Sequence, residues 1–394
     1  MAEYELEVGT EGGTELLMEA GIWLGVSSFL YYSFFRSKSD REKIDITFAN
    51  IKYGFKEQSP EHFKTFKTST KTTYLYHLPY GLIDNPGLEE VLSKTLNKPV
   101  KVSMRNKLFI HVYKSDIKKK YDYTFAESKD WSMPIGYKLG EELIHHNFDV
   151  IPHMTVAGMT RQGKTVLLKL IMAHLIYNHP EDVEFYIIDL KGGLEFSRYE
   201  KLKQVKRVAS NSDEAYQLLT KINKKIKSDM QHFKKHGYSN VLDTPIKKRR
   251  FIIVDEAAEL TPAKHHDRET KNRLLYCQQI LSEVCRVAGA LGYRNIFCTQ
   301  YPTTDTLPRQ IKQNSDAKIS FRLPTEIASR VAIDESGAEL LNVPGRAIYR
   351  THTKEIIQVP FISDKSILEE FRRYEDDSAE ETSNERGENL ITFG

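Results

Sequence analysis

The segment VAGMTRQGKTVLLKL, residues 156–170, places the pattern G-x-x-x-x-G-K-T between two hydrophobic stretches of different kinds. The stretch 154–158 is short and apolar like a buried strand, whereas 164–178 has the length and apolar content of a helix. In that context the loop amides curl around a pyrophosphate, and the positive end of the helix adds to the attraction. We therefore predict a phosphate-binding loop that binds a nucleoside triphosphate. Its residues are Gly158, Met159, Thr160, Arg161, Gln162, Gly163, Lys164 and Thr165.

Two adjacent carboxylates further along the chain indicate what happens to the nucleotide. Lys164 is expected to reach the β- and γ-phosphates, and the Thr165 hydroxyl is expected to coordinate Mg²⁺. The apolar segment FIIVDEAAEL, 251–260, then carries Asp255 and Glu256. We expect Asp255 to hold Mg²⁺ through water and Glu256 to polarise the attacking water. This pair favours hydrolysis over transfer of the phosphoryl group to an acceptor.

Two other segments end in polar residues where apolar strands are expected to stop. Gln300 follows the apolar run of IFCTQYP, 296–302, and is interpreted as a sensor of the γ-phosphate or the water, or as a simple turn residue. In IDLKGGLEF, 188–196, Asp189 and Lys191 are candidates to bridge the nucleotide edge to a neighbouring subunit, although a tight turn explains the glycines equally well.

The order of the remaining segments predicts an α/β fold with a mostly parallel, doubly covered sheet. Strands are expected at 183–190, 249–260, 294–301, 317–323 and 345–351, and helices at 212–237 and 273–292. These elements define a nucleotide-binding domain at 133–365. Before it, a short helix at 87–97 and two strands around Arg105-Asn106 indicate a small α+β domain at 45–128.

Both ends of the chain differ from these domains in composition. Residues 16–35 are almost uncharged and long enough for the roughly 30 Å core of a bilayer. Basic residues follow them, so a helix in 1–38 that spans the membrane would leave the rest of the chain cytoplasmic. The other interpretation is a buried or partner-facing helix. Residues 375–394 are acidic and polar, as in a disordered tail.

Bulk composition excludes a few classes of protein. The chain has 394 residues and a net charge of +3, which is too small to argue for nucleic acid by itself. Its three cysteines form no C-x-x-C pair, which argues against a disulfide framework or a zinc site and fits a reducing cytosol.

The motifs together resemble those of the FtsK/SpoIIIE family of hexameric, RecA-like ATPases that pump DNA. The segments that carry this resemblance, in family order, are PHMTVAGMTRQGKT, IIDLKGG, FIIVDEAAEL, RVAGALGYRNIFCTQYP, IKQNSDAKISFRL and ASRVAIDESGAELLNVPGRAIY. The resemblance covers about residues 133 to 362. It implies a RecA-like P-loop NTPase fold, a homohexameric ring, and DNA bound without regard to its sequence. It also implies that Lys164, Thr165, Asp255 and Glu256 form the ATPase centre and that Gln300 is the sensor.

The family pattern also suggests an arginine finger. Arg286, in CRVAGALG, matches the arginine before the family's small-residue turn and is a candidate to reach a neighbour's γ-phosphate. A solvated helix arginine is the other interpretation.

We expect the chain to be without the family's winged-helix module and four-span membrane domain. It is therefore similar to the short coupling proteins and plasmid- or element-borne translocases of Gram-positive bacteria. This likeness implies a role in transfer, replication or segregation, with a relaxase or other transfer machinery as partner.

Basic clusters indicate where DNA would touch the chain. They lie at Lys221, Lys224, Lys225 and Lys227, at Lys234 and Lys235, at 247–250, and at 118–123. Each cluster taken singly is equally typical of a solvated face. Two alternatives to a translocase stay open: a secretion-type ATPase, and an ATP-dependent DNA-binding protein that assembles without moving DNA.

Overall fold

The computed structural model describes residues 38–375, and the chain separates between Asp116 and Ile117 into two compact units. The expected helix at 16–35 and nearly all of the expected acidic tail lie outside the described residues. Within 38–375, no helix is both long and apolar enough to cross a bilayer.

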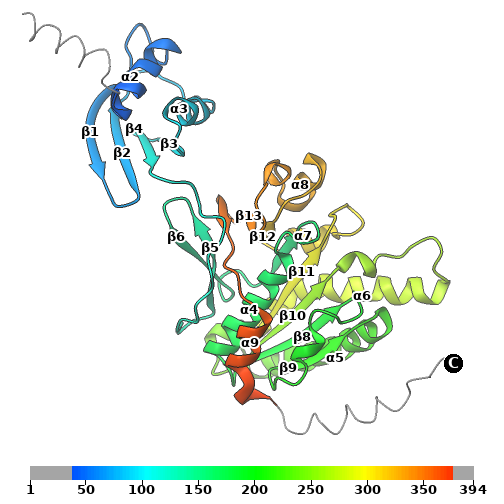
Figure 1. Ribbon diagram of the computed structural model, residues 1–394. Coiled ribbons are helices and arrows are strands. Elements are labelled where there is room, and N and C mark those ends of the chain that lie inside the picture. Colours follow the sequence, from blue (N-terminus) through cyan, green and yellow to red (C-terminus); the bar gives the residue numbers. More distant parts are fainter. Residues whose placement is uncertain (1–37, 376–394) are drawn as a thin grey trace, which may run out of the picture. The chain divides into compact units, whose positions relative to one another are not determined.

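Within residues 38–116, the smaller unit is a four-stranded antiparallel sheet with two helices (Figure 1). The sheet has the order β1-β2-β4-β3. Its elements are α2 (Asp40–Asn50), β1 (Glu61–Lys67), β2 (Lys71–His77), α3 (Leu88–Leu96), β3 (Val100–Met104) and β4 (Leu108–Tyr113). Ser39 caps α2 through a reciprocal bond with Glu42, and the apolar faces of both helices join one core with β2 and β4.

The larger unit is built on a ten-stranded sheet within the described residues. From one edge to the other the strands are β6 (Glu142–Asn147), β5 (Ser132–Lys138), β14 (Lys354–Gln358), β13 (Arg346–Arg350), β12 (Ala317–Ser320), β7 (Met154–Ala157), β11 (Tyr293–Thr299), β10 (Arg249–Asp255), β8 (Val183–Asp189) and β9 (Val205–Ala209). The strands from β12 to β9 run parallel, and those from β13 to β6 are antiparallel.

Helices cover both faces of this sheet (Figure 1). On one face lie α4 (Lys164–Asn178) and α9 (Asp364–Phe371), and on the other lie α5 (Ser212–His236) and α6 (Arg268–Val287). Two short helices, α7 (Arg309–Gln313) and α8 (Glu326–Ile333), precede and follow β12. Side chains of β10 alternate between the two cores: Phe251 faces α4, whereas Ile252 faces α5 and α6.

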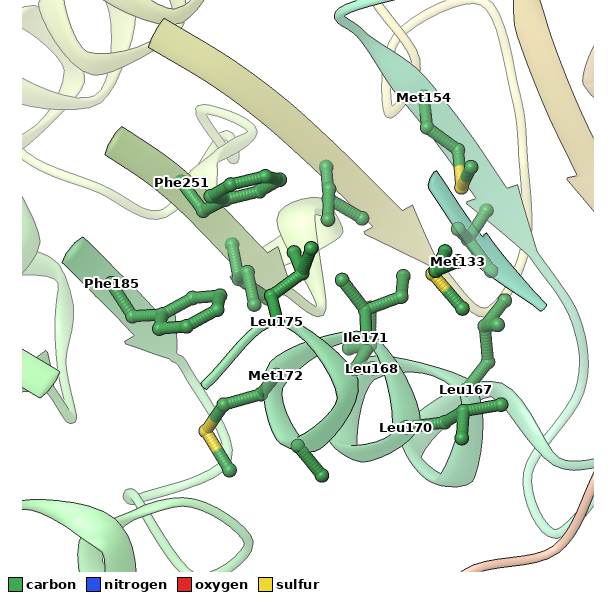
Figure 2. Packing of buried hydrophobic residues seen from close by; sticks show 14 of the residues in the cluster. Met133, Met154, Leu167, Leu168, Leu170, Ile171, Met172, Leu175, Phe185 and Phe251 are labelled. Atoms are coloured by element: carbon green, nitrogen blue, oxygen red, sulfur yellow. The ribbon is translucent and has the colours of Figure 1, made fainter. Parts of the chain in front are cut away.

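Helix α4 is buried almost all round, which explains its nearly uniform apolar sequence. Figure 2 shows Leu168, Ile171 and Leu175 of this helix pointing toward the strands that carry Phe185 and Phe251. The helix that follows the phosphate-binding loop is therefore held in place by a large hydrophobic core.

The predicted α/β class with a mostly parallel sheet is confirmed, and α4 spans the expected 164–178. Residues 117–128, assigned from sequence to the small domain, lie in the larger unit. The reason is pairing with a distant segment: the Tyr123 amide donates to the Phe361 carbonyl at 2.8 Å, and the Phe361 amide donates to the Tyr121 carbonyl at 2.7 Å. Pairing between such distant segments leaves no local signal in the sequence.

Candidate ATPase site

The carboxyl ends of four neighbouring parallel strands bring the predicted site residues together. Strands β7, β11, β10 and β8 are adjacent, and they lead into the phosphate-binding loop, Gln300, Glu256 and Lys191 respectively. In parallel sheets this edge is where ligands bind, because all the connecting loops open there.

The two glycines of the loop are required by space and by backbone angle. A Cβ on Gly158 would lie 2.7 Å from Cβ of Phe321, which is closer than real Cβ contacts. Gly163 has φ +113°, and a Cβ there would lie 3.0 Å from the Phe321 ring and 3.2 Å from Cα of Gly345. The loop thus packs tightly against Phe321 and Gly345, which lie far from it in the sequence.

Backbone hydrogen bonds hold the loop from three sides. The Gly158 amide donates to the Thr299 carbonyl at 3.2 Å, and the Met159 amide donates to the Arg322 carbonyl at 3.0 Å. The Gly345 amide donates to the Gln162 carbonyl at 2.8 Å. Because β11 and the segment after β12 carry these contacts, the loop has its shape before any ligand arrives.

Lys164 lies between the two predicted carboxylates. Its Nζ is 3.5 Å from Oδ1 of Asp255 and 3.7 Å from Oε2 of Glu256. Lys164 is only 4% exposed and Asp255 is fully buried. The Lys164 ammonium and both Asp255 oxygens have no hydrogen-bond partner among the described residues. Buried charged atoms left in this condition are typical of a site built for a charged ligand.

The surroundings of Asp255 shift its pKa upward. Burial is the main cause, the charges of Lys164 and Lys191 oppose it, and the nearby carboxylates of Asp189 and Glu256 add to the rise. A cation placed beside Asp255 would favour its ionised form, as Mg²⁺ does for the carboxylates that hold it.

Lys191 is a second cation at the same carboxylates. Its Nζ is 3.8 Å from Oδ2 of Asp255 and 3.5 Å from Oε2 of Glu256. Asp189, fully buried beside Asp255 in the sheet, accepts hydrogen bonds from the amides of Lys191, Glu195 and Phe196. Asp189 therefore shapes the turn that aims Lys191 at the site.

Glu256 and Gln300 link the strand ends to the loop. Glu256 has φ +62°, a left-handed conformation that is rare outside glycine. Its side chain is buried, and Oε1 accepts a hydrogen bond from the backbone amide of Gln300 at 3.3 Å. The Gln300 side chain in turn accepts from the Thr160 hydroxyl at 2.8 Å. A chain of two hydrogen bonds therefore runs from Glu256 through Gln300 to the phosphate-binding loop.

A cavity of about 910 Å³ opens over the loop, a volume suited to a nucleotide. Met159, Thr160, Arg161, Gly163, Lys164, Thr165, Lys191 and Gln300 line one part of it. Val343, Pro344, Val359 and Phe361 form a largely apolar wall elsewhere, and Nζ of Lys120 lies 4.8 Å from the centre of the Phe361 ring. Such a wall fits a flat heterocyclic base.

These residues fit ATP and Mg²⁺. The amides and Lys164 would hold the phosphates, and Thr165 and Asp255 would hold the metal, which is the arrangement expected for a metal kept largely by phosphate, water and one or two protein oxygens. The unpartnered oxygens of Asp255 are the observation that supports the metal.

The structure places Arg286 away from the other predicted site residues. It lies near the end of α6, beside the residues that precede β7 and begin β11, whereas the phosphate-binding loop follows the other end of β7. The side chain is 60% exposed, and its nearest carboxylate is Glu283 at 3.8 Å on the same helix. Within one chain Arg286 does not reach the nucleotide cavity.

Sequence reasoning missed the residues that reach the cavity from outside the strand–loop–helix unit. Lys119 and Lys120, expected as part of a DNA-binding patch, line the nucleotide cavity together with Gln358 and Phe361. Their only local signal was a run of lysines. The antiparallel strands that carry the far wall bring them to the site.

Known proteins with similar sequences carry the same domain. Residues 124–304 match the profile of the FtsK/SpoIIIE family. The DNA translocase FtsK of Chlorobaculum tepidum is 24% identical over 288 residues, which cover 68% of this chain and 33% of that protein. The DNA translocase FtsK of Leptospira interrogans is 26% identical over 267 residues, which cover 62% of this chain and 27% of that protein. The chain therefore spans about a third or less of the length of these relatives.

Solved structures show the same fold. The conjugation coupling protein TcpA of pCW3, in a monomer form with ATPγS, has a TM-score of 0.61 and 20% identity, covering 84% of this chain and 99% of that one. The type VII secretion ATPase EccC of Thermomonospora curvata has a TM-score of 0.53 and 18% identity, covering 66% of this chain and 33% of that one. Residues 124–304 are therefore similar to the FtsK/SpoIIIE family, and the site geometry and the shared fold are those of a P-loop ATPase.

Proposed function

We propose that the protein is an ATP-driven DNA translocase that moves DNA through a ring of identical subunits. The observation that carries the proposal is the connection from Glu256 through Gln300 to Thr160, because it ties the hydrolytic carboxylate to the loop that senses the phosphates. The domain family, and relatives named as DNA translocases, support DNA as the substrate.

The residues of the chain divide the work at the site. Glu256, held in place by the Gln300 amide, orients a water and accepts its proton. Lys164 and Lys191 neutralise the carboxylates in the described geometry, and Lys164 is placed to turn toward phosphate oxygens. Magnesium-bound ATP supplies the phosphoanhydride whose cleavage is exergonic. The Thr160–Gln300 hydrogen bond joins the phosphate-binding loop to the segment after β11. A change in the nucleotide at the loop would therefore be passed to the position of this segment.

We further propose a homohexamer in which Arg286 acts on the nucleotide of a neighbour. Its exposure at the strand edge opposite the loop is what a contribution in trans requires. The likeness in fold to a conjugation coupling protein supports a role in plasmid or element transfer, with a relaxase as partner. A membrane anchor in residues 16–35, with the motor in the cytoplasm, belongs to the same proposal.

The test is the ATPase rate without DNA, with double-stranded DNA and with single-stranded DNA, beside a Lys164→Ala control. We expect DNA to raise the rate several-fold and the control to abolish it. A rate that DNA leaves unchanged, while Lys164→Ala removes it, contradicts DNA as the substrate and favours the secretion-type alternative. Displacement of a triplex-forming strand then separates movement from a DNA-dependent ATPase that only assembles.

A further inference from the structure

A cleft of about 340 Å³ lies at the edge of the large sheet, between β9 and α5. We call it the β9–α5 groove. Four exposed cationic side chains line it: Lys206 and Arg207 from the strand, and Lys221 and Lys225 from the helix. Among residues 38–375, β9 is the last strand of the sheet and pairs with β8, so the groove lies at an edge of the sheet.

The positive charge of this groove is only partly balanced within the described residues. None of its four cations forms an ion pair within 4.0 Å among the described residues, although Nζ of Lys206 donates to the Lys203 carbonyl at 2.6 Å and the charge of Lys225 acts on Glu184 from further away. Glu214, which also lines the groove, accepts from the Ser210 amide at 2.8 Å. Glu184, the next carboxylate on this side, is paired with Lys248 at 3.2 Å and with Arg250 at 3.1 Å.

The described chain ends beside the groove. The Lys203 amide donates to the Tyr374 carbonyl at 3.1 Å, and Glu375, the last described residue, forms an isolated antiparallel bridge with Leu202. Leu202 precedes β9 by only a short turn, closed by a 2.8 Å bond from the Val205 amide to its carbonyl. The last described residue therefore lies beside the turn that leads into β9.

The segment that follows is acidic. Residues 376–394 contain Asp376, Asp377, Glu380, Glu381, Glu385 and Glu388 and a single basic residue, Arg386. Because the segment is tethered at Glu375, its local concentration at the groove is in the millimolar range.

We propose that residues 376–394 dock in the β9–α5 groove of their own chain, their carboxylates neutralising Lys206, Arg207, Lys221 and Lys225. Charge complementarity, the tether at Leu202 and the open edge of β9 all favour this occupant over a free polyanion. The docked segment covers a basic face that would otherwise be open to nucleic acid.

Zero-length carbodiimide cross-linking of the full chain, dilute and without nucleotide or DNA, tests the proposal. We expect amide cross-links from carboxylates of 376–388 to Lys206, Lys221 or Lys225. They should disappear at about 1 M salt, where the Debye length falls to about 3 Å. Lys221→Glu with Lys225→Glu should lower cross-linking at Lys206 about fivefold. The matched control is Lys224→Glu with Lys227→Glu, on exposed positions of the same helix outside the groove, and should change nothing.

A second variant leaves the folded part untouched. Asp376→Asn, Asp377→Asn, Glu380→Gln and Glu381→Gln together should raise hydrogen exchange at the amides of β9 in the full chain. The proposal is overturned if hydrogen exchange at β9 does not change. It is also overturned if Lys221→Glu with Lys225→Glu leaves the yield of cross-links unchanged. Cross-links between isotopically labelled and unlabelled chains would assign the groove to a second copy and also overturn it.

A third outcome would assign the groove to DNA. If the cross-links are absent while Lys221→Glu with Lys225→Glu weakens DNA binding, the groove is a nucleic-acid surface and the proposal fails. The main measurements contain neither ATP nor DNA, so they stand or fall independently of translocation.

Discussion

Burial of Asp255 raises the free energy of its ionised form. Its raised pKa means that the folded chain holds a proton that the unfolded chain has already released, in the window between the unfolded and the folded pKa. As pH rises through that window the free energy of unfolding falls, because the charged carboxylate is poorly solvated in the fold.

We expect Asp255→Asn to raise the free energy of unfolding of the nucleotide-free protein at neutral pH by about 1 kcal/mol, while it removes ATPase activity. The variant should also show a flatter dependence of stability on pH above pH 4. Urea denaturation across pH measures both effects. Asp305→Asn, at an exposed loop position, is the control, and a loss of stability in Asp255→Asn would contradict the account.

Gly163 combines two constraints that can be separated by substitution. Its φ of +113° disfavours any side chain, and a Cβ would also press on Phe321 and Gly345. We expect Gly163→Ala to lower the free energy of unfolding by about 2–4 kcal/mol. Gly237→Ala is the matched control, since Gly237 has φ +70° and no atom within 4 Å of a built Cβ, and should cost about 1 kcal/mol. Equal losses in urea denaturation would show that space at Gly163 does not matter.

At the scale of elements, Asp149 ties together the amino ends of β10 and β11. Its carboxylate accepts from Arg249 at 2.8 and 3.0 Å and from Arg294 at 2.7 Å, and these arginines are 4% and 1% exposed. Burial by itself raises the pKa of Asp149, but the hydrogen bonds and charges of Arg249 and Arg294 bring it below its usual value. The stability that Asp149 supplies is therefore present above its unfolded pKa and lost as pH falls through its lower, folded pKa.

We expect Asp149→Ala to lower the free energy of unfolding by about 3–5 kcal/mol, because two buried guanidinium groups lose their partner. The comparison is Asp213→Ala, which breaks an exposed ion pair with Arg273 at 2.8 Å and should change stability by less than about 1 kcal/mol. Denaturation at neutral pH measures the stability of both variants. Similar losses of stability in the two would contradict the argument from the buried ion pairs of Asp149.

At the scale of the whole molecule, the role proposed for Arg286 requires an assembly of subunits. If it completes a neighbour's site, Arg286→Ala should lower kcat at least about 100-fold and leave nucleotide affinity nearly unchanged. Adding the inactive variant to wild-type protein should then depress the rate more than dilution predicts. Arg268→Ala, at an exposed position on the same helix, serves as control. If the ATPase rate of the mixture falls only in proportion to the wild-type fraction, Arg286 does not act on a neighbouring subunit and is an ordinary surface arginine.

The site was predictable where chemistry and backbone lie in one segment. The strand–loop–helix at 154–178 and the carboxylates Asp255 and Glu256 follow from patterns that local geometry enforces. The far wall of the nucleotide cavity was not predictable in this way. Lys120 and Phe361 meet because a bridge joins Asp122 to Phe361, and a pairing between such distant segments has no local pattern.

The sequence by itself determined the α/β class, the phosphate-binding loop and the acids that accompany it, because helix and strand periodicity and loop chemistry are local properties. Only the tertiary structure decided how these parts act together. It placed Lys164 and Lys191 between two buried carboxylates, linked Glu256 to Thr160 through Gln300, and set Arg286 at the other end of the strands. Those relations depend on the order of strands in the sheet and on burial, which are fixed by packing over the whole unit.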